Sequence, residues 1–385
     1  SMTEKLYDIF PYETEFEATV LQAETQDGRL LLVLDRTLFF PNEGGQSCDK
    51  GWIAGHAVQD VNLCDDLVYH SLAADAPLRP GMQIHGKIDW AHRFSNMQQH
   101  SAEHLFSGFV HKRYGFANCG FHLSDSIATM DFDGPLSAAQ IAETELSVNE
   151  AIYANVPSRA FFPSPEEAKT LSYRSKKEIE GPLRLLSFEG YDLCACCAPH
   201  VGRTGEIGLF KVQSFQRYKG GVRISYLAGK RAFLAARQQF DLLNRLFRDF
   251  SANAETLEGF VLKLREELSA AKSKALSVQE KLLRYELERC GESVLFLPDV
   301  DMNTARELIT SHTKETGRNL FCFIPNDKGY RYIISTAVSD ARQAQTLLQT
   351  RLHAKGGGSD RLIMGTVDAA MEEIQDVCTI LSQTL

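Results

Sequence analysis

Two short stretches of the sequence carry side chains that bind metal ions. In "HSAEH", His100 and His104 are four residues apart, so on a helix both imidazoles lie on one face and can reach the same ion. Further along the chain, "CACCAPH" offers Cys196 and His200 in a C-x-x-x-H arrangement. Three imidazoles and one thiolate suit tetrahedral zinc. The residues therefore predict a Zn²⁺ site, although spacing alone does not separate Cys196 from its neighbouring cysteines Cys194 and Cys197.

Two other interpretations of these residues remain open. The letters H-x-x-E-H match an inverted zinc-protease motif in which Glu103 is the catalytic general base, but such sites take their third ligand from a downstream carboxylate. The cysteines would then have no role. Alternatively, four protein ligands make a closed, structural zinc site, and the chain is a non-catalytic RNA-binding module.

A glycine motif, "TLFFPNEGGQSCDKG" at residues 37–51, offers a second set of binding groups. Gly44 and Gly45 allow the backbone to approach a ligand closely, and the side chains of Thr37 and Gln46 can form hydrogen bonds with it. The alternative interpretation is a simple β-turn between two strands.

The charge of the chain limits its partners. A net charge of −9 argues against a general nucleic-acid coat, because non-specific phosphate binding scales with the number of basic contacts. Nucleic acid would have to bind to local basic patches, each of which can equally be an ordinary solvated face. These patches are "HKRYG" (Lys112, Arg113), "SYRSKK" (Arg174, Lys176, Lys177) and "QRYKGGVR" (Arg217, Lys219, Arg223).

The cysteines and the hydropathy indicate the compartment. No window approaches the roughly 18 to 20 uninterrupted apolar residues of a membrane-spanning helix, and "SMTEKLYDIF" lacks the pattern of a secretory signal. The 9 cysteines are odd in number and unevenly spread, which fits free thiols better than a disulfide framework. We expect a cytoplasmic protein without a membrane partner.

The pattern along the chain predicts a multi-domain α+β protein. Short alternating runs broken by turn residues predict an N-terminal small β-barrel, and helices mixed with strands then predict an α+β domain with an antiparallel sheet. A helical arm and an α/β domain follow. The expected boundaries are 1–90 for the barrel, 91–230 for the metal-containing domain, 231–290 for the arm and 291–385 for the last domain.

The arm carries a heptad pattern. Apolar residues spaced alternately four and three apart predict a helix roughly 45 Å long at about 1.5 Å per residue, with an apolar stripe that needs a partner helix. The partner is either the helix of residues 229–250 or the same arm of a second subunit, so we expect a homodimer through the arm or the last domain as one outcome. The stripe comprises Leu257, Val261, Leu264, Leu268, Ala271, Ala275, Val278, Leu282 and Tyr285.

Over residues 7–230 the chain resembles the editing domain of alanyl-tRNA synthetase and its freestanding relatives, the AlaX proteins. That family shows T-x-F-Y-P-x-x-G-G-Q, then H-x-x-x-H, then C-x-x-x-H-V followed by T-G-x-I-G; this sequence has "TLFFPNEGGQ", "HSAEH" and "CCAPHVGRTGEIG". The last match favours Cys196 as the ligand. "KGGGSDRLIMGTV" resembles, more loosely, the DHH-associated domain of the long AlaX relatives, and no aminoacylation domain is found in the sequence.

The resemblance implies zinc-dependent hydrolysis of the ester that joins a wrong amino acid, serine or glycine, to the alanine tRNA. It assigns recognition of the seryl hydroxyl to Thr37 and orientation of the ester to Gln46. The tRNA end would need basic side chains near the pocket, and the candidates are Arg93, Lys112, Arg113, Arg217, Lys219 and Arg223.

The sequence departs from the family within the cysteine loop. Relatives carry small residues such as Gly-Gly-Thr between the cysteine and the histidine, whereas this chain has Cys197, Ala198 and Pro199. Because proline has no N–H, a backbone donor for an oxyanion would be lost there. We therefore expect weaker activity or a different preferred ester.

Overall fold

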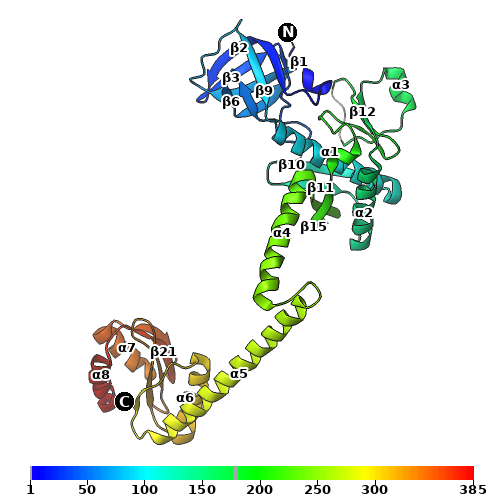
Figure 1. Ribbon diagram of the computed structural model, residues 1–385. Coiled ribbons are helices and arrows are strands. Elements are labelled where there is room, and N and C mark those ends of the chain that lie inside the picture. Colours follow the sequence, from blue (N-terminus) through cyan, green and yellow to red (C-terminus); the bar gives the residue numbers. More distant parts are fainter. Residues whose placement is uncertain (1, 177–180) are drawn as a thin grey trace. The chain divides into compact units, whose positions relative to one another are not determined.

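The structure is a computed structural model that describes residues 2–176 and 181–385 (Figure 1). The chain forms two compact units, Ser1–Asn244 and Arg245–Leu385, and each is described by itself. Lys177, one of the basic residues noted above, lies outside the described residues. The mixed α+β class expected from the sequence is confirmed.

A strongly curved antiparallel sheet forms the N-terminal part of the first unit. Alternate side chains point inward, so that Phe16, Ala18 and Val20 are buried while the residues between them are not. Strand β6 packs against β8, which makes the sheet nearly closed. Its seven strands, in the spatial order β6-β5-β9-β2-β3-β8-β7, are β2 (Glu15–Gln26), β3 (Arg29–Leu34), β5 (Gly51–Ile53), β6 (His56–Val58), β7 (Asp60–Cys64), β8 (Leu67–Ala73) and β9 (Gln83–Ile88).

The helix α1 (Trp90–Tyr114) follows this sheet and contains "HSAEH". It begins where the side chain of Asp89 accepts a hydrogen bond from the backbone N–H of His92, and it ends at Gly115, whose φ of 73° is left-handed. Every side chain from Asn96 to Phe106 is buried. Because buried polar groups need partners, this polar run through the interior indicates a site rather than a purely apolar core.

Two further sheets and the helix α2 surround α1. A four-stranded antiparallel sheet, in the order β10-β11-β16-β15, packs on it together with α2, and β14 of a three-stranded sheet contacts it as well. The elements are β10 (Asn118–Leu123), β11 (Ala128–Phe132), α2 (Ala138–Ala154), β12 (Ser158–Phe161), α3 (Pro165–Thr170), β13 (Leu185–Phe188), β14 (Asp192–Ala195), β15 (Phe210–Tyr218) and β16 (Gly221–Ala228). Short elements complete the unit: β1 (Glu4–Lys5), η1 (Leu6–Asp8), β4 (Arg36–Thr37) and η2 (Thr204–Ile207).

The second unit is a five-stranded sheet with helices. Its strand order is β17-β18-β19-β21-β20, parallel between β17 and β18 and antiparallel elsewhere. The unit contains α5 (Leu257–Arg289), β17 (Val294–Phe296), α6 (Met302–Thr316), β18 (Leu320–Pro325), β19 (Tyr330–Ser335), α7 (Ala341–Leu352), β20 (Lys355–Gly358), β21 (Leu362–Val367) and α8 (Met371–Thr384). None of the described helices combines the length and apolar character that a membrane crossing requires.

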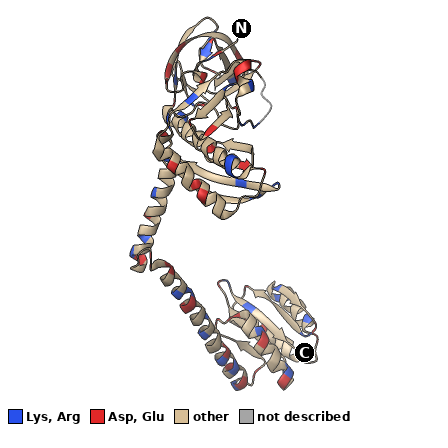
Figure 2. Cartoon of the chain, turned by 90° about the vertical axis from the view of Figure 1, so that its right-hand side faces the viewer, with Lys and Arg blue, Asp and Glu red and all other residues tan. Residues whose placement is uncertain are grey.

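The helix expected from the heptad pattern is present as α5. Within α5 only Leu283 and Leu287 are buried. Apolar residues of the predicted stripe, such as Leu264, Leu268 and Val278, are exposed. Basic and acidic side chains are interspersed along α5 (Figure 2), so it presents no continuous face of one charge. The boundary between the two units lies within α4 (Gly229–Phe250).

Candidate metal centre and cavity

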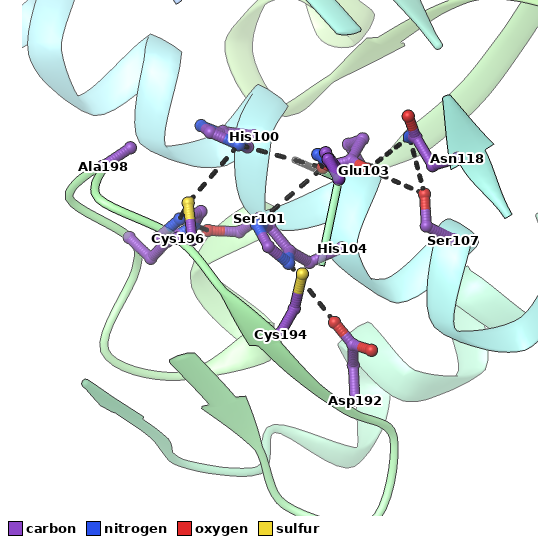
Figure 3. Close-up of polar contacts among 12 residues, drawn as sticks. His100, Ser101, Glu103, His104, Ser107, Asn118, Asp192, Cys194, Cys196 and Ala198 are labelled. Atoms are coloured by element: carbon purple, nitrogen blue, oxygen red, sulfur yellow. Dashed lines mark hydrogen bonds and ion pairs between the residues drawn. The ribbon is translucent and has the colours of Figure 1, made fainter. Parts of the chain in front are cut away.

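The four predicted ligands converge in the first unit (Figure 3). His100 and His104 lie one turn apart on α1, and Cys196 and His200 belong to the loop after β14. One ligand atom from each of the four residues lies within 4.8 Å of the others. The Sγ atom of Cys196 is 3.8 Å from Nε2 of His100 and 3.2 Å from Nε2 of His200.

Each of the three imidazoles is held through its Nδ1 atom, so that its Nε2 atom faces the centre of the cluster. Metal-binding histidines usually have such a partner, because the contact fixes the ring orientation and the tautomer. The contacts join His100 Nδ1 to Gln46 Oε1 (2.8 Å), His200 Nδ1 to Ser101 Oγ (3.1 Å) and His104 Nδ1 to Asp192 Oδ2 (3.3 Å).

The donor set fits a zinc ion. Burial raises the pKa of the Cys196 thiol, but the neighbouring imidazoles of His100 and His200 outweigh it and hold the pKa well below its usual range, which favours the thiolate. Burial lowers the pKa of His200 to about 3, so its ring is neutral, as a ligand must be. The buried Nε2 atom of His104 has no hydrogen-bond partner among the described residues. An ion bound to these four atoms would satisfy it.

A cavity of about 640 Å³ lies beside the ligands and is lined by His100, Cys196 and the glycine turn. The turn is closed by backbone hydrogen bonds in both directions between Glu43 and Gln46. Gly44 and Gly45 have φ of 60° and 80°, and a Cβ atom on Gly45 would lie 2.1 Å from the Phe121 carbonyl oxygen. Glycine is therefore required at this position. The motif is both a turn and a cavity wall.

Comparison with known proteins identifies relatives of the chain. Residues 183–225 match the family described as threonyl and alanyl tRNA synthetase second additional domain, and residues 2–92 match class II (A) tRNA synthetases. The alanyl-tRNA editing protein AlaX-L of Pyrococcus horikoshii is 26% identical over 98% of this chain and 97% of its own length. This chain is a homologue of the alanyl-tRNA editing proteins.

Two other relatives are an alanyl-tRNA editing protein and an alanine–tRNA ligase. An alanyl-tRNA editing protein of Mus musculus is 27% identical over 83% of the chain and 79% of its own length. The alanine–tRNA ligase of Ignicoccus hospitalis is 30% identical over 73% of the chain, but the chain spans only 32% of the length of that ligase.

In this homologue Glu103 lies beside the metal ligands but does not line the cavity. Its side chain is fully buried, and Oε2 is 3.8 Å from Nε2 of both His100 and His104. Burial raises the pKa of this carboxyl, but the Lys176 ammonium outweighs it and lowers the pKa. Both oxygens already accept hydrogen bonds: Oε1 from Ser107 Oγ (2.7 Å) and Asn118 Nδ2 (2.7 Å), and Oε2 from Lys176 Nζ (2.8 Å). Oε1 thus has two donors and Oε2 is paired with Lys176, an arrangement that does not favour Glu103 as the general base of the protease interpretation.

Thr37 also lies away from the cavity. It is fully buried in β4, against the N-terminal sheet, where its hydroxyl donates to Nε2 of His70 (2.8 Å) and accepts from the backbone N–H of Phe39 (3.0 Å). The other ring nitrogen of His70 bonds to the carbonyl oxygen of Leu32 (3.0 Å). The hydroxyl that the resemblance assigns to serine recognition is therefore engaged inside the sheet.

Arg93 is likewise an interior residue. Its side chain is 0% exposed, and its guanidinium forms an ion pair with Asp49 and donates to the carbonyl oxygens of Pro11 and Leu38. We expected Arg93 to meet tRNA, but its position gives it no surface for doing so. It ties α1 to the N-terminal sheet instead.

The other basic candidates are on the surface in two places. Lys112 and Arg113 are exposed in the last turn of α1. Arg217, Lys219 and Arg223 belong to the hairpin of β15 and β16, where Arg223 pairs with Asp131 and Arg217 is exposed. None of the five lines the cavity.

Several side chains around the four ligands were not predicted as part of the site. Arg184 donates to the carbonyl oxygens of Cys196 (3.0 Å) and Ala198 (2.8 Å) and so holds the ligand loop. Asp192 supports His104, and the Arg174 guanidinium donates to both of its oxygens at 2.7 Å. Only Ser101, which lies inside "HSAEH", was adjacent to a recognised motif.

Proposed function

We propose that this chain hydrolyses the ester bond between a wrongly attached amino acid, serine or glycine, and the 3′ end of the alanine tRNA, acting in trans. The observation that carries the proposal is the convergence of three Nδ1-anchored imidazoles and one thiolate at the wall of the 640 Å³ cavity. The homology to alanyl-tRNA editing proteins supports the substrate class.

The cofactor that we propose is zinc, held by His100, His104, Cys196 and His200. When bound, it supplies an electrophile that polarises the ester carbonyl or lowers the pKa of water, from about 15.7 to about 7 in favourable sites. The surrounding residues keep the ligands in place: Gln46, Ser101 and Asp192 fix the three rings, and Arg184 fixes the backbone of the cysteine loop. Gln46 would thus affect the orientation of the ester indirectly, by holding the ring of His100. Glu103 would act as a positioning residue beside His100 and His104.

Serine and alanine differ by one hydroxyl. An apolar pocket distinguishes two such substrates by a factor of only about 10² in kcat/KM. Thr37 is the candidate from the resemblance. Because its hydroxyl already bonds His70, we propose that Thr37 first stabilises the N-terminal sheet, and that any direct contact with serine would require this hydrogen bond to break.

We propose that the tRNA approaches over the exposed basic residues of α1 and the β15–β16 hairpin. The residues with exposed side chains are Lys112, Arg113, Arg217 and Lys219. Phosphate contacts of this kind position the nucleic acid without reading its sequence. Arg223, already paired with Asp131, would contribute less.

The exposed apolar stripe of α5 supports a pairing of this helix with a second apolar helix, either in the same chain or in a second copy. We retain a homodimer through α5 or the second unit as a proposal, together with the DHH-associated character of that unit. Light scattering of the purified chain would establish the number of subunits.

The proposed activity is tested by measuring release of serine from seryl-tRNA of the alanine type and release of alanine from the correctly charged tRNA, with and without a zinc chelator. Fast serine release that the chelator stops, beside slow alanine release, is expected. Binding of tRNA without turnover would favour the structural-zinc alternative. Peptide hydrolysis that is lost in Glu103→Gln would favour the protease.

A further inference from the structure

The cavity beside the metal ligands contains a carboxylate in its wall. Among the described residues that line it, Asp8 and Glu43 are the two acidic ones. Glu43 begins the glycine turn: its N–H donates to the carbonyl oxygen of Gln46 (3.2 Å), and the N–H of Gln46 donates back (3.0 Å). Since the side chain of Gln46 accepts from His100, the backbone of Glu43 is fixed relative to a metal ligand.

Glu43, rather than Asp8, is the carboxylate next to the ligand loop. Its side chain lines the cavity together with Cys196 and Cys197, and it interacts electrostatically with both cysteines. The corresponding neighbours of Asp8 are Arg184 and Lys5, with no cysteine among them, and Lys5 is also a neighbour of Glu43. Burial raises the pKa of both carboxyls. Such burial is costly unless a cation or a donor partners the carboxylate.

An aminoacyl ester brings such a cation into this part of the cavity. Its α-ammonium group is two bonds from the ester carbonyl carbon, which places the nitrogen within roughly 2.5 Å of the reacting atom by ordinary covalent geometry. A divalent cation held by the four ligands would repel this ammonium, and a neighbouring carboxylate offsets the repulsion most effectively where little water screens it. The cavity wall next to Cys196 offers Glu43 for this purpose.

We propose that Glu43 binds the α-ammonium group of the aminoacyl ester. The inference rests on the proposed ester-hydrolase function and names the residue that recognises the amino acid backbone. It makes Glu43 a specificity-determining residue, because an ester whose amino group is acylated carries no charge there. Peptidyl and N-acetylated esters would then be poor substrates, whereas both serine and glycine esters keep the required group.

The test uses Glu43→Gln, with Asp8→Asn as the matched control, since both replace a cavity carboxylate by its amide. The substrates are seryl-tRNA of the alanine type and the same tRNA carrying N-acetylserine. A charge-assisted hydrogen bond contributes roughly ten- to a hundredfold in binding. Glu43→Gln should therefore raise KM for seryl-tRNA by about that factor and leave hydrolysis of the N-acetylated ester unchanged, so that the preference for the free amino group collapses. Asp8→Asn should keep the preference.

Three results would overturn the proposal. One is a wild-type protein that hydrolyses both esters equally; a second is a Glu43→Gln variant that keeps the wild-type preference; the third is an Asp8→Asn variant that loses it. A wild-type protein that releases serine from neither substrate would instead refute the ester-hydrolase function itself. Bound zinc per chain and the melting temperature, measured for each variant, identify any loss that comes from misfolding.

Binding can be measured independently of turnover. A stable analogue, adenosine with serine attached through a 3′-amide, is titrated into the wild-type protein and the two variants by calorimetry. We expect Glu43→Gln to weaken this analogue by about ten- to a hundredfold and to leave its N-acetylated form unaffected. Equal weakening of both forms would mean that Glu43 shapes the cavity without binding the ammonium group.

Discussion

The Nδ1 atom of His100 donates a 2.8 Å hydrogen bond to Oε1 of Gln46, the last residue of the glycine turn. One end of this turn thereby fixes an imidazole of the candidate metal site, and its middle, Gly44 and Gly45, forms part of the cavity wall. Two motifs that are more than fifty residues apart in the sequence therefore act as one structural element. Changes in the turn should affect metal binding as well as substrate binding.

The first prediction concerns this hydrogen bond. Gln46→Ala leaves Nδ1 of His100 without an acceptor, so the ring is free to rotate and to change tautomer. Loss of such a supporting contact typically weakens metal affinity by about 10- to 100-fold. Competition with a fluorescent zinc chelator should give a dissociation constant raised by that factor.

The matched control for Gln46→Ala is Gln83→Ala, which changes an exposed glutamine of the N-terminal sheet. It should bind zinc as the wild-type protein does. If Gln46→Ala binds zinc with unchanged affinity, the side chain does not position His100.

The second prediction concerns Thr37. In Thr37→Val the buried Nε2 atom of His70 loses its donor, and leaving such a group unpaired costs about 1–3 kcal/mol of unfolding free energy. Because Thr37 does not line the cavity, the ratio of seryl to alanyl ester hydrolysis should stay within about twofold of the wild type. Urea unfolding and paired deacylation assays measure the two effects.

Thr37→Ser retains the hydroxyl, so it should preserve both the unfolding free energy and the ratio of seryl to alanyl ester hydrolysis. A large fall in the seryl preference of Thr37→Val, with stability unchanged, would instead support direct recognition of serine by Thr37, as the family resemblance implies.

The sequence predicted the residue types of the site better than their surroundings. The spacing within "HSAEH" and "CCAPH" is a local property, and the structure brings those four residues together. Arg93 and Thr37 have side chains suited to binding, but the long-range contacts that bury them, to Asp49 and to His70 respectively, are encoded by no local pattern. Asp192, Arg184 and Lys176 reach the site only through long-range folding, so spacing could not identify them.

For the fold, too, local patterns were predictable from the sequence and long-range contacts were not. Alternating burial in β2 and the long apolar stripe of α5 were visible as periodic patterns, because each depends on residues close in sequence. The strand order β10-β11-β16-β15 depends on a hairpin that returns some ninety residues later, and only tertiary contacts specify it.

The third prediction concerns pH and His70. Burial lowers the pKa of His70 from 6.5 to about 4, so the ring is neutral in the folded protein while the unfolded chain binds a proton below pH 6.5. Stability due to this residue therefore falls as the pH drops from about 6.5 towards 4. Between pH 7.5 and pH 5 the loss should be about 2 kcal/mol.

Urea unfolding followed by tryptophan fluorescence tests this, because both tryptophans, Trp52 and Trp90, lie in the first unit. His70→Gln removes the titrating group, so its stability should depend less steeply on pH over this interval. Equal slopes for the wild type and His70→Gln would show that His70 is not buried as a neutral ring.

The last prediction concerns the approach of tRNA. Arg217→Ala and Lys219→Ala each remove an exposed positive charge from the β15–β16 hairpin. If these side chains contact phosphates, each variant should raise KM for aminoacyl-tRNA several-fold, leave kcat unchanged and reduce the dependence of log affinity on log salt by about one unit.

The matched control is Arg79→Ala, which changes an exposed arginine of the N-terminal sheet region. It should change neither KM nor the salt dependence. A salt dependence that stays the same in both hairpin variants would place the tRNA on another surface. A short ester substrate, the aminoacyl group on adenosine alone, should be hydrolysed equally by all four proteins, because it is too small to reach beyond the cavity to the hairpin.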